Sequence, residues 1–393
     1  MLNISNIEEL RSKVAHKEEI REANAGDGQQ MKGMKTFCYM IAGDSTFDDA
    51  WSRECRGIVF AADGSVAGRP LHKFFNLNER AETQVNEINW GMVARVMEKR
   101  DGSMIHTVIV PHDSHPDKKV ARVKSKKSFE SDVASAALNW LYDKREYQAL
   151  LTYLCNKNCT AIFEYTSPSA RIVLYYPDTE MRLLHVRENV SGRYFNIIEL
   201  EELAKDFGVP LVDEVTEFYD YWGEERLCMF NIQRMMDAAK TRENIEGWIV
   251  QLDDGEMLKV KTDWYLRRHR AMTFLRPRDI AAMVIAQELD DLKALMVGDG
   301  IDILPLLEVE QRVLSDIRGL EGAVKLIAPE EDYKMDRKEF VFKYREKAGS
   351  LFGMLMQRYS GKEPNYVEFF EKHMLKLYSL HQLNLVPSVA EAE

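Results

Sequence analysis

The chain has 393 residues, of which 45% are hydrophobic and 30% charged, so it is too apolar for a disordered protein. Its net charge of −11 argues against a surface coated with basic residues for nucleic acid, although a local basic cleft is compatible with it. No apolar run approaches the ~18 residues of a membrane span. The five cysteines are an odd number, which favours a reducing compartment over a disulfide scaffold.

The first 30 residues read as one polar amphipathic helix, and the N-terminus lacks the apolar core of a signal peptide. From residue 36 to about 265, short β-branched and aromatic runs such as 171–176 alternate with turns, which predicts strands. Helical patterns at 129–147 and 198–207 interrupt them. Because several strands follow one another without a helix between them, we predict an α+β domain with mostly antiparallel sheets.

The pattern changes after residue 265. Helical periodicity then dominates in four segments, at 279–296, 305–326, 338–358 and 365–383. We therefore predict two domains, a first one of residues 1–265 and an all-helical second one of residues 266–393. Arginines cluster between residues 267 and 278, and their role stays open between an RNA contact and an ordinary surface cluster.

Lys99 is the first candidate for chemistry. It opens the string Lys99-Arg100-Asp101-Gly102 directly after a mostly apolar run, so its amine stands at the end of a predicted strand beside an Asp-Gly turn. Lys259 and Lys261 are two residues apart in a later β run. In a strand their side chains leave the same face, and they repel each other unless an anion lies between them.

Other polar residues surround this pattern in the sequence. Glu164 lies inside an apolar β run and Glu246 opens another, while Arg56 stands at a strand entry. Lys73 precedes two phenylalanines, and Lys124 to Lys127 form a basic turn. Each alone is compatible with ordinary surface charge or a core aromatic. Together they supply cations for a polyphosphate, a ring for a base, carboxylates for ribose and metal, and an amine nucleophile, which nucleotidyl transfer to a lysine requires.

The K-x-D-G form at Lys99, followed by the glutamates and the paired lysines, is similar to the covalent nucleotidyltransferase superfamily, which includes polynucleotide ligases and capping enzymes. Over about residues 36–267 the chain resembles the RNA ligase 1 family of T-even-like bacteriophages, of the tRNA-repair type. The strings that carry this resemblance are Glu54-Cys55-Arg56-Gly57, Lys73-Phe74-Phe75-Asn76-Leu77-Asn78-Glu79, Glu243-Asn244-Ile245-Glu246-Gly247 and Lys259-Val260-Lys261-Thr262-Asp263-Trp264-Tyr265.

The resemblance implies an α+β nucleotidyltransferase domain, with ATP-grasp-like antiparallel sheets of the polynucleotide ligase type. A helical C-terminal domain with RNA substrate preference would follow it. The implied enzyme is an ATP-dependent RNA ligase with Mg²⁺ or Mn²⁺ that joins 5′-phosphate and 3′-hydroxyl RNA ends. Lys99 would take AMP from ATP, the AMP would pass to the 5′-phosphate, and the 3′-hydroxyl would displace it.

The implied biological setting is the repair of cleaved tRNA during phage infection, in the cytoplasm of the bacterial host cell. The implied partner is RNA, tRNA above all, and we expect a monomer without membrane association.

By the same resemblance, the catalytic residues are Lys99, Glu246, Lys259 and Lys261. Glu246 would orient a hydrated metal ion, and the two later lysines would disfavour a charged Lys99 and neutralise the α-phosphate. The nucleotide-binding set also contains Tyr39 and Phe75 beside the nucleotide, Arg56 and Lys73 on the triphosphate, Gly102 for close backbone approach, Lys126 on phosphate or substrate, and Glu164 on the ribose.

Two kinds of alternative stay open. One is another covalent nucleotidyltransferase, either a DNA ligase or a capping guanylyltransferase, and the helices after the paired lysines argue against the capping enzyme. The other is a non-catalytic protein that binds RNA ends, which is expected to have lost Lys99 or the paired lysines. A zinc site at Cys155 and Cys159, and a divalent ion at Asp290 and Asp291, are both weaker predictions than ordinary structural roles.

Overall fold

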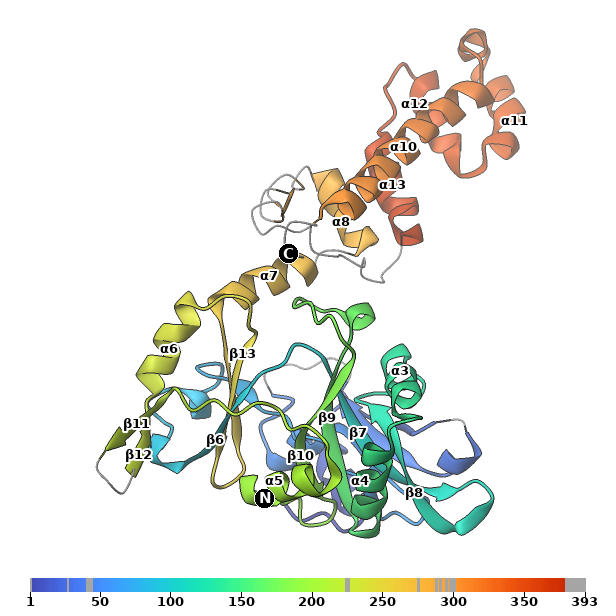
Figure 1. Ribbon diagram of the computed structural model, residues 1–393. Coiled ribbons are helices and arrows are strands. Elements are labelled where there is room, and N and C mark those ends of the chain that lie inside the picture. The colour runs from blue at the N-terminus through green and yellow to red at the C-terminus, as the bar shows by residue number, and fades with distance from the viewer. Residues whose placement is uncertain are drawn as a thin grey trace. The chain divides into compact units, whose positions relative to one another are not determined.

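The structure is a computed structural model, and the chain forms two compact units, residues 1–266 and 267–393 (Figure 1). Among the described helices, none combines the length and the apolar composition of a membrane-spanning segment. The residues that the structure describes are 2–26, 28–39, 45–222, 227–273, 276–286, 289, 292–293, 296 and 302–378.

Fourteen strands are described, all in the first unit. They are β1 (Ile20–Asn24), β2 (Lys35–Tyr39), β3 (Arg56–Phe60), β4 (Val66–Gly68), β5 (Phe75–Asn76), β6 (Val93–Glu98), β7 (Ser103–His112), β8 (His115–Ser125), β9 (Cys159–Thr166), β10 (Glu180–Glu188), β11 (Tyr219–Trp222), β12 (Leu227–Phe230), β13 (Gly247–Leu252) and β14 (Met257–Lys261).

The strands build three four-stranded sheets and a two-stranded ribbon. The orders are β1-β2-β3-β4, β10-β9-β7-β8 and β5-β14-β13-β6, with β11-β12 as the ribbon. Neighbouring strands are antiparallel except for β14 and β5, which are parallel. The prediction of mostly antiparallel sheets in an α+β unit is therefore confirmed. The turn after β6 leads into β7, so it connects two different sheets.

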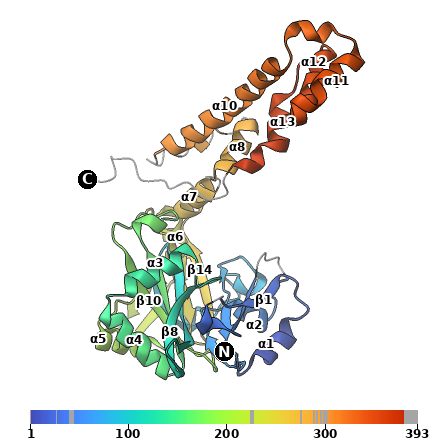
Figure 2. The same cartoon turned by 90° about the vertical axis from the view of Figure 1, so that its right-hand side faces the viewer.

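Helices of the first unit pack against its sheets. The second unit contributes further helices. Helices α3 (Asp132–Leu141) and α4 (Arg145–Asn156) lie on the β10-β9-β7-β8 sheet (Figure 2). Leu150 and Leu154 of α4 belong to the same buried cluster as Phe163 of β9. The helices are α1 (Ile7–Val14), α2 (Ala50–Glu54), α3 (Asp132–Leu141), α4 (Arg145–Asn156), α5 (Ile197–Phe207), α6 (Ile232–Thr241), α7 (Asp263–Thr273), α8 (Pro277–Ala286), α10 (Leu304–Ile327), α11 (Arg337–Ala348), α12 (Phe352–Tyr359) and α13 (Tyr366–His373).

Three sequence predictions for the first unit were wrong in their extent or type. The N-terminal helix ends at Val14, and β1 follows it. The helix predicted over 129–147 is two helices, α3 and α4, separated by a turn. The run 171–176 forms bends instead of a strand. Its backbone amides at Val173 and Leu174 donate to the Asp101 carboxylate, so a side chain satisfies the donors that strand pairing would otherwise have used.

The described part of the second unit is helical, as predicted. Its core contains Leu306 and Val313 of α10, Phe340 of α11 and Phe370 of α13. The segment 338–358 is divided between α11 and α12, because the chain turns at Gly349. Asp290 and Asp291, weighed above as ion ligands, lie outside the described residues.

Candidate active site

Lys99 stands where two sheets meet. It directly follows β6, and its backbone N–H donates to the Gly247 carbonyl over 2.9 Å, which extends the pairing of β6 with β13 by one residue. The next three residues cross to β7 in the neighbouring sheet. The Lys99 residue is therefore anchored at its backbone by a ladder hydrogen bond, and its side chain as a whole is 21% exposed.

Glu246 is the common partner of two of the predicted catalytic lysines. One oxygen, Oε2, lies 2.7 Å from Lys99 Nζ, and the other, Oε1, lies 2.9 Å from Lys261 Nζ. The Glu246 side chain is only 3% exposed. The sequence predicted that nearby cations would disfavour a charged Lys99, but the structure places a carboxylate directly on this amine. The ion pair must open before the Lys99 nitrogen can act as a nucleophile.

Lys259 lies among cations. Burial is the largest cause of its low pKa of about 6, and Arg56, Lys73, Lys99 and Lys261 lower the pKa further. Its amine lies 4.8 Å from the centre of the Phe74 ring. Every one of these neighbouring charges belongs to the set predicted from the sequence. The arrangement is a concentration of positive charge that favours a bound polyanion.

Tyr39 and Lys126 lie together at the margin of this cationic group. The Lys126 amine is 4.1 Å from the centre of the Tyr39 ring. Burial by itself would raise the pKa of the Tyr39 phenol, but Lys126, Arg56 and Lys73 outweigh burial, so the pKa is lowered. The end of β2 therefore faces the same positive region as the start of β3, where Arg56 lies.

Phe75 is covered by cationic side chains. The charged groups of Lys73, Arg53 and Arg80 lie 5.0, 5.3 and 4.7 Å from the centre of its ring, and the residue is only 4% exposed. Phe74, the preceding residue, is the ring that both Arg56 and Lys259 approach. Phe75 thus offers little free surface to a base, whereas its neighbour borders the cationic group directly.

Gly102, in the turn before β7, packs against Glu164 and its neighbours on β9. Burial raises the pKa of Glu164 to about 7, and Lys99 and Arg56 offset part of this rise while Glu246 and Asp101 add to it. A side-chain carbon on Gly102 would lie 2.5 Å from the Tyr165 carbonyl oxygen and 3.1 Å from Glu164 Cγ. The sequence predicted that this glycine lets the backbone approach a nucleotide; the close approach seen in the structure is to β9.

Asp101 and Tyr265 form a link that the sequence did not assign. The Tyr265 hydroxyl donates to Asp101 Oδ1 over 2.7 Å, and Asp101 Oδ2 accepts the amides of Val173 and Leu174. Asp101 is 3% exposed. The Asp101 carboxylate therefore connects the turn after Lys99 to Tyr265 and to the segment that contains Val173 and Leu174. The aspartate of the K-x-D-G string is the sequence feature that could have indicated this role.

A buried ionic group at Glu54 was also missed. The Glu54 carboxylate accepts hydrogen bonds from both Arg69 and Arg187 at 2.7 to 3.2 Å, and both arginine side chains are fully buried. Burial opposes ionisation of Glu54, but the two arginines hold its pKa at about 2. Glu54 lies two residues before Arg56, so this group fixes the segment that presents the predicted triphosphate ligand. No local sequence pattern shows partners 15 and 133 residues away.

Gly247 offers a test of how tightly the site is built. Its φ is +141°, a conformation that favours glycine, and an added Cβ would lie 2.0 Å from the Val260 carbonyl oxygen. We expect Gly247→Ala to push β14 away from Glu246 and to lower adenylation at least ~100-fold, comparable to losing a preorganised charge-stabilising group. Gly255→Ala, in the β13–β14 turn, also has a positive φ but lies away from the lysines; equal losses in both variants would contradict this explanation.

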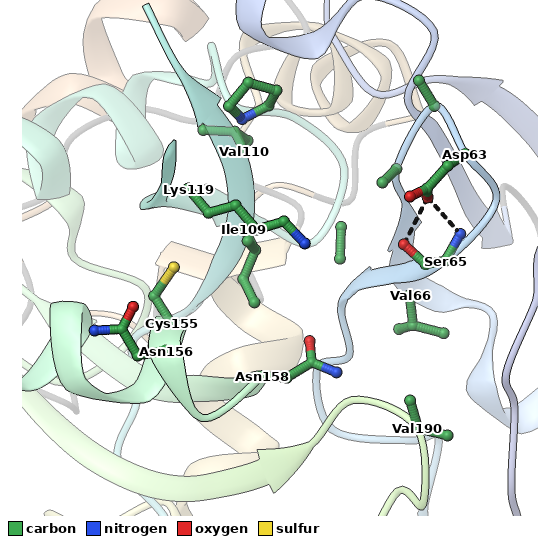
Figure 3. Close-up of a pocket in the computed structure, with 14 residues that line it drawn as sticks. Asp63, Ser65, Val66, Ile109, Val110, Lys119, Cys155, Asn156, Asn158 and Val190 are labelled. Carbon is green, nitrogen blue, oxygen red and sulfur yellow. Dashed lines mark hydrogen bonds between the residues drawn. The ribbon is translucent and has the colours of Figure 1, made fainter. Parts of the chain in front are cut away.

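A separate cavity of about 760 Å³ lies between the β3–β4 turn, β7, β8 and the end of α4. Figure 3 shows the Lys119 amine pointing into it, near Ile109. None of the predicted site residues lines it. Cys155, weighed above as a zinc ligand, lies in its wall as a free thiol, and Cys159 is a buried free thiol as well.

Comparisons with known proteins found similarity to several RNA ligases. The chain is 27% identical over 377 residues to RNA ligase 1 of bacteriophage TS2126, covering 91% of this chain and 88% of that one. It is 31% identical over 246 residues to a candidate RNA ligase of Thermovibrio ammonificans, covering 60% of this chain and 58%, less than two thirds, of the relative. An RNA ligase structure from Naegleria gruberi matches 46% of this chain and 52% of its own at 18% identity, with a TM-score of 0.34.

A family model described as RNA ligase matches residues 54–265. This span is more than half of the 393 residues and contains Arg56, Lys99 and the paired lysines, although it begins after Tyr39. The chain therefore belongs to the RNA ligase family.

Proposed function

We propose that this chain is an ATP-dependent RNA ligase that joins 5′-phosphate and 3′-hydroxyl RNA ends through a lysyl-AMP intermediate on Lys99. The observation that supports this most strongly is the shared carboxylate: Glu246 binds Lys99 and Lys261 at once. Near these lysines, Arg56 and Lys73 supply positive charge for a triphosphate, and Lys259 lies among the same cations and becomes charged when a bound phosphate anion raises its pKa.

The first step follows from these contacts. Lys99 must lose one ammonium proton to solvent before its nitrogen lone pair attacks the α-phosphorus of ATP, and the nitrogen loses a second proton to solvent once it is bonded to phosphorus. An N–P bond forms while the P–O bond to pyrophosphate breaks, so negative charge moves onto the leaving group. Lys259 and Lys261 are fixed in one short strand, and they would stabilise that charge without rearranging. In the later steps the AMP passes to the RNA 5′-phosphate and is displaced by a 3′-hydroxyl.

The donor set suits a hydrated divalent ion. Among the described residues, no group of three or more His, Cys, Asp or Glu side chains could hold a metal by itself. Mg²⁺ is commonly bound by one or two carboxylates together with waters and substrate phosphates, and Glu246 could supply one such carboxylate. Mg²⁺ or Mn²⁺ bound there would help neutralise the polyphosphate.

A direct test compares nucleotides and RNA ends. The purified protein is incubated with labelled ATP or GTP and a divalent ion, and then with RNA that carries a 5′-phosphate or a 5′-hydroxyl. We expect a covalent label from ATP only, and joining of the 5′-phosphorylated RNA only. Labelling by GTP would point to a capping enzyme, and RNA binding without any covalent label would point to a non-catalytic end-binding protein.

Proton uptake on ATP binding is a further expected result. Lys259, with its pKa of about 6, is largely neutral at pH 7.5 in the free protein, and a bound phosphate anion raises the pKa of a nearby amine. Binding should therefore take up protons and weaken as the pH rises. Calorimetry in two buffers of different ionisation enthalpy measures this uptake. We expect Lys259→Met to reduce it, whereas uptake unchanged by this substitution would assign the protons to another group.

The helical second unit belongs to the same proposal, as the part that selects the RNA. The repair of cleaved tRNA in an infected bacterial cytoplasm is the proposed role, and it is supported by the similarity to phage RNA ligases. We expect removal of residues 267–393 to preserve adenylation better than discrimination between nicked tRNA and unstructured RNA. Ligation rates on the two substrates test this, and an insoluble truncated protein would instead indicate a structural role for the second unit.

A further inference from the structure

A second pocket, of about 410 Å³, lies beside β14. One wall is β14 from Lys259 to Lys261, and another is the segment from Asn76 to Glu79, which leaves the sheet directly after β5. The α6 residue Met236 also contributes. The volume falls within the range of small-molecule sites. The pocket therefore adjoins the paired lysines, but it lies on the edge of their strand and contains neither Tyr39, Arg56 nor Glu164.

Asn76 presents an unused hydrogen-bond acceptor here. Its Nδ2 donates to Glu79 Oε2 over 2.6 Å, and its backbone N–H donates to the same oxygen over 2.7 Å. These two bonds fix the orientation of the amide. The remaining oxygen, Oδ1, is buried and accepts no hydrogen bond within the described part of the chain. A buried acceptor without a donor costs free energy, so a donor from a ligand would be favourable at this point.

The Asn76 side chain lies on the same face of its sheet as the Lys259 side chain. Asn76 is the register partner of Lys259 in the parallel pair β5–β14, and paired residues in a sheet send their side chains to the same face. Asn76 therefore faces the same side as the lysine that lies among the cations. A ligand group that donates to Asn76 would lie next to the phosphate chemistry, while Leu77 and Met236 offer apolar surface in the same pocket.

A ribose hydroxyl meets these requirements. It donates a hydrogen bond, and in RNA it lies within one nucleotide of the reacting phosphate. The 2′-hydroxyl is also the group by which a protein distinguishes RNA from DNA. The ribose of ATP has a different expected partner, Glu164 on β9, which does not line this pocket. Both RNA ends carry 2′-hydroxyls, but only in the 3′-terminal nucleotide is the 2′-hydroxyl on the carbon next to the attacking 3′-oxygen, so we assign this pocket to the strand that ends in the 3′-hydroxyl.

We propose that this pocket binds the terminal nucleoside of the 3′-hydroxyl RNA strand, with Asn76 Oδ1 accepting a hydrogen bond from its 2′-hydroxyl. This inference rests on the proposed RNA ligase function and adds to it the selection of the acceptor end. Asn76 is a positioning residue: it holds the nucleoside whose 3′-hydroxyl loses its proton to solvent and attacks the adenylated 5′-phosphate. The P–O bond to AMP breaks as the new phosphodiester forms, and AMP leaves.

The test isolates the last step. Pre-adenylated RNA is supplied as donor, and acceptors that end in a ribonucleotide or a 2′-deoxyribonucleotide are compared. We expect the wild-type protein to join the ribonucleotide end roughly 10-fold faster, the effect of about one hydrogen bond. Asn76→Ala should slow the ribonucleotide acceptor to about the rate of the deoxy acceptor, so that the ratio falls to about one. Adenylation of the variant by ATP should stay close to that of the wild type.

A second variant tests the pocket without changing Asn76. Met236→Trp places a large ring against the pocket and should slow the joining of both acceptors. Met229→Trp is the matched control, because Met229 is 53% exposed and does not line the pocket. Near-normal joining by Met229→Trp and slow joining by Met236→Trp are the expected pair of results.

Three results would overturn the inference. One is a wild-type ratio retained in Asn76→Ala, and another is normal joining by Met236→Trp. The third is an Asn76→Ala protein with a raised KM for ATP and an unchanged acceptor ratio, which would assign the pocket to ATP. A wild-type protein that forms no adenylate and joins neither acceptor would overturn the proposed function itself, and this inference with it.

Discussion

Lys99→Ala is expected to abolish both the covalent labelling of the protein by ATP and the joining of 5′-phosphorylated RNA. The substitution removes the only protein atom that, in the proposed reaction, forms a bond to the α-phosphorus, so no neighbouring cation can compensate. Gel analysis with labelled ATP measures the first effect, and RNA joining the second. The same variant should still seal pre-adenylated RNA, because that step no longer requires the amine.

Lys118→Ala is the matched control for this result, since Lys118 is an exposed lysine on β8. It should label and join like the wild type. Residual labelling of Lys99→Ala at a tenth of the wild-type level or more would mean that another nucleophile carries the AMP, and the assignment of Lys99 would be wrong.

Glu246→Gln is expected to lower adenylation at least ~100-fold. The amide keeps the shape of the side chain but removes the charge that holds the Lys99 and Lys261 ammonium groups at 2.7 and 2.9 Å. Two effects compete, because losing the carboxylate also removes an ion pair that the Lys99 amine must leave before it can react. We expect the loss of position and of a metal-binding oxygen to dominate, since the site relies on fixed charges in a largely buried place.

Glu243→Gln removes a carboxylate three residues earlier on an exposed position and should leave adenylation unchanged. Because Glu246 is buried, the thermal midpoint of each variant is measured as well. A folded Glu246→Gln protein that adenylates at the wild-type rate would show that the carboxylate is not needed for the first step.

The local patterns of the sequence predicted the parts of the site that lie on one strand or one turn. A period of two places Lys259 and Lys261 on one face of β14, and the Asp-Gly turn after Lys99 ends β6. The same patterns did not predict that the Glu246 carboxylate pairs with these lysines. Glu246 reaches Lys99 only because β13 pairs with β6. For that reason, the prediction that neighbouring lysines would disfavour a charged Lys99 did not take this carboxylate into account.

Long-range polar contacts account for the other differences. The run 171–176 has strong β propensity, but the Asp101 carboxylate binds two of its amides and holds it in bends. The string Glu54-Cys55-Arg56-Gly57 does not predict the partners of Glu54, whose side chain is only 4% exposed and is paired with the buried Arg69 and Arg187. Propensity scales describe neighbours in the chain, whereas these contacts join residues 15 to 133 positions apart.

The most direct measurement of the central claim is the intact mass of the protein after incubation with ATP and Mg²⁺, followed by mapping of the modified peptide. The account predicts an added mass of one AMP, located on Lys99 and absent from Lys99→Ala. An AMP found on Lys259, Lys261 or any other residue, or no added mass from a folded protein, would contradict it.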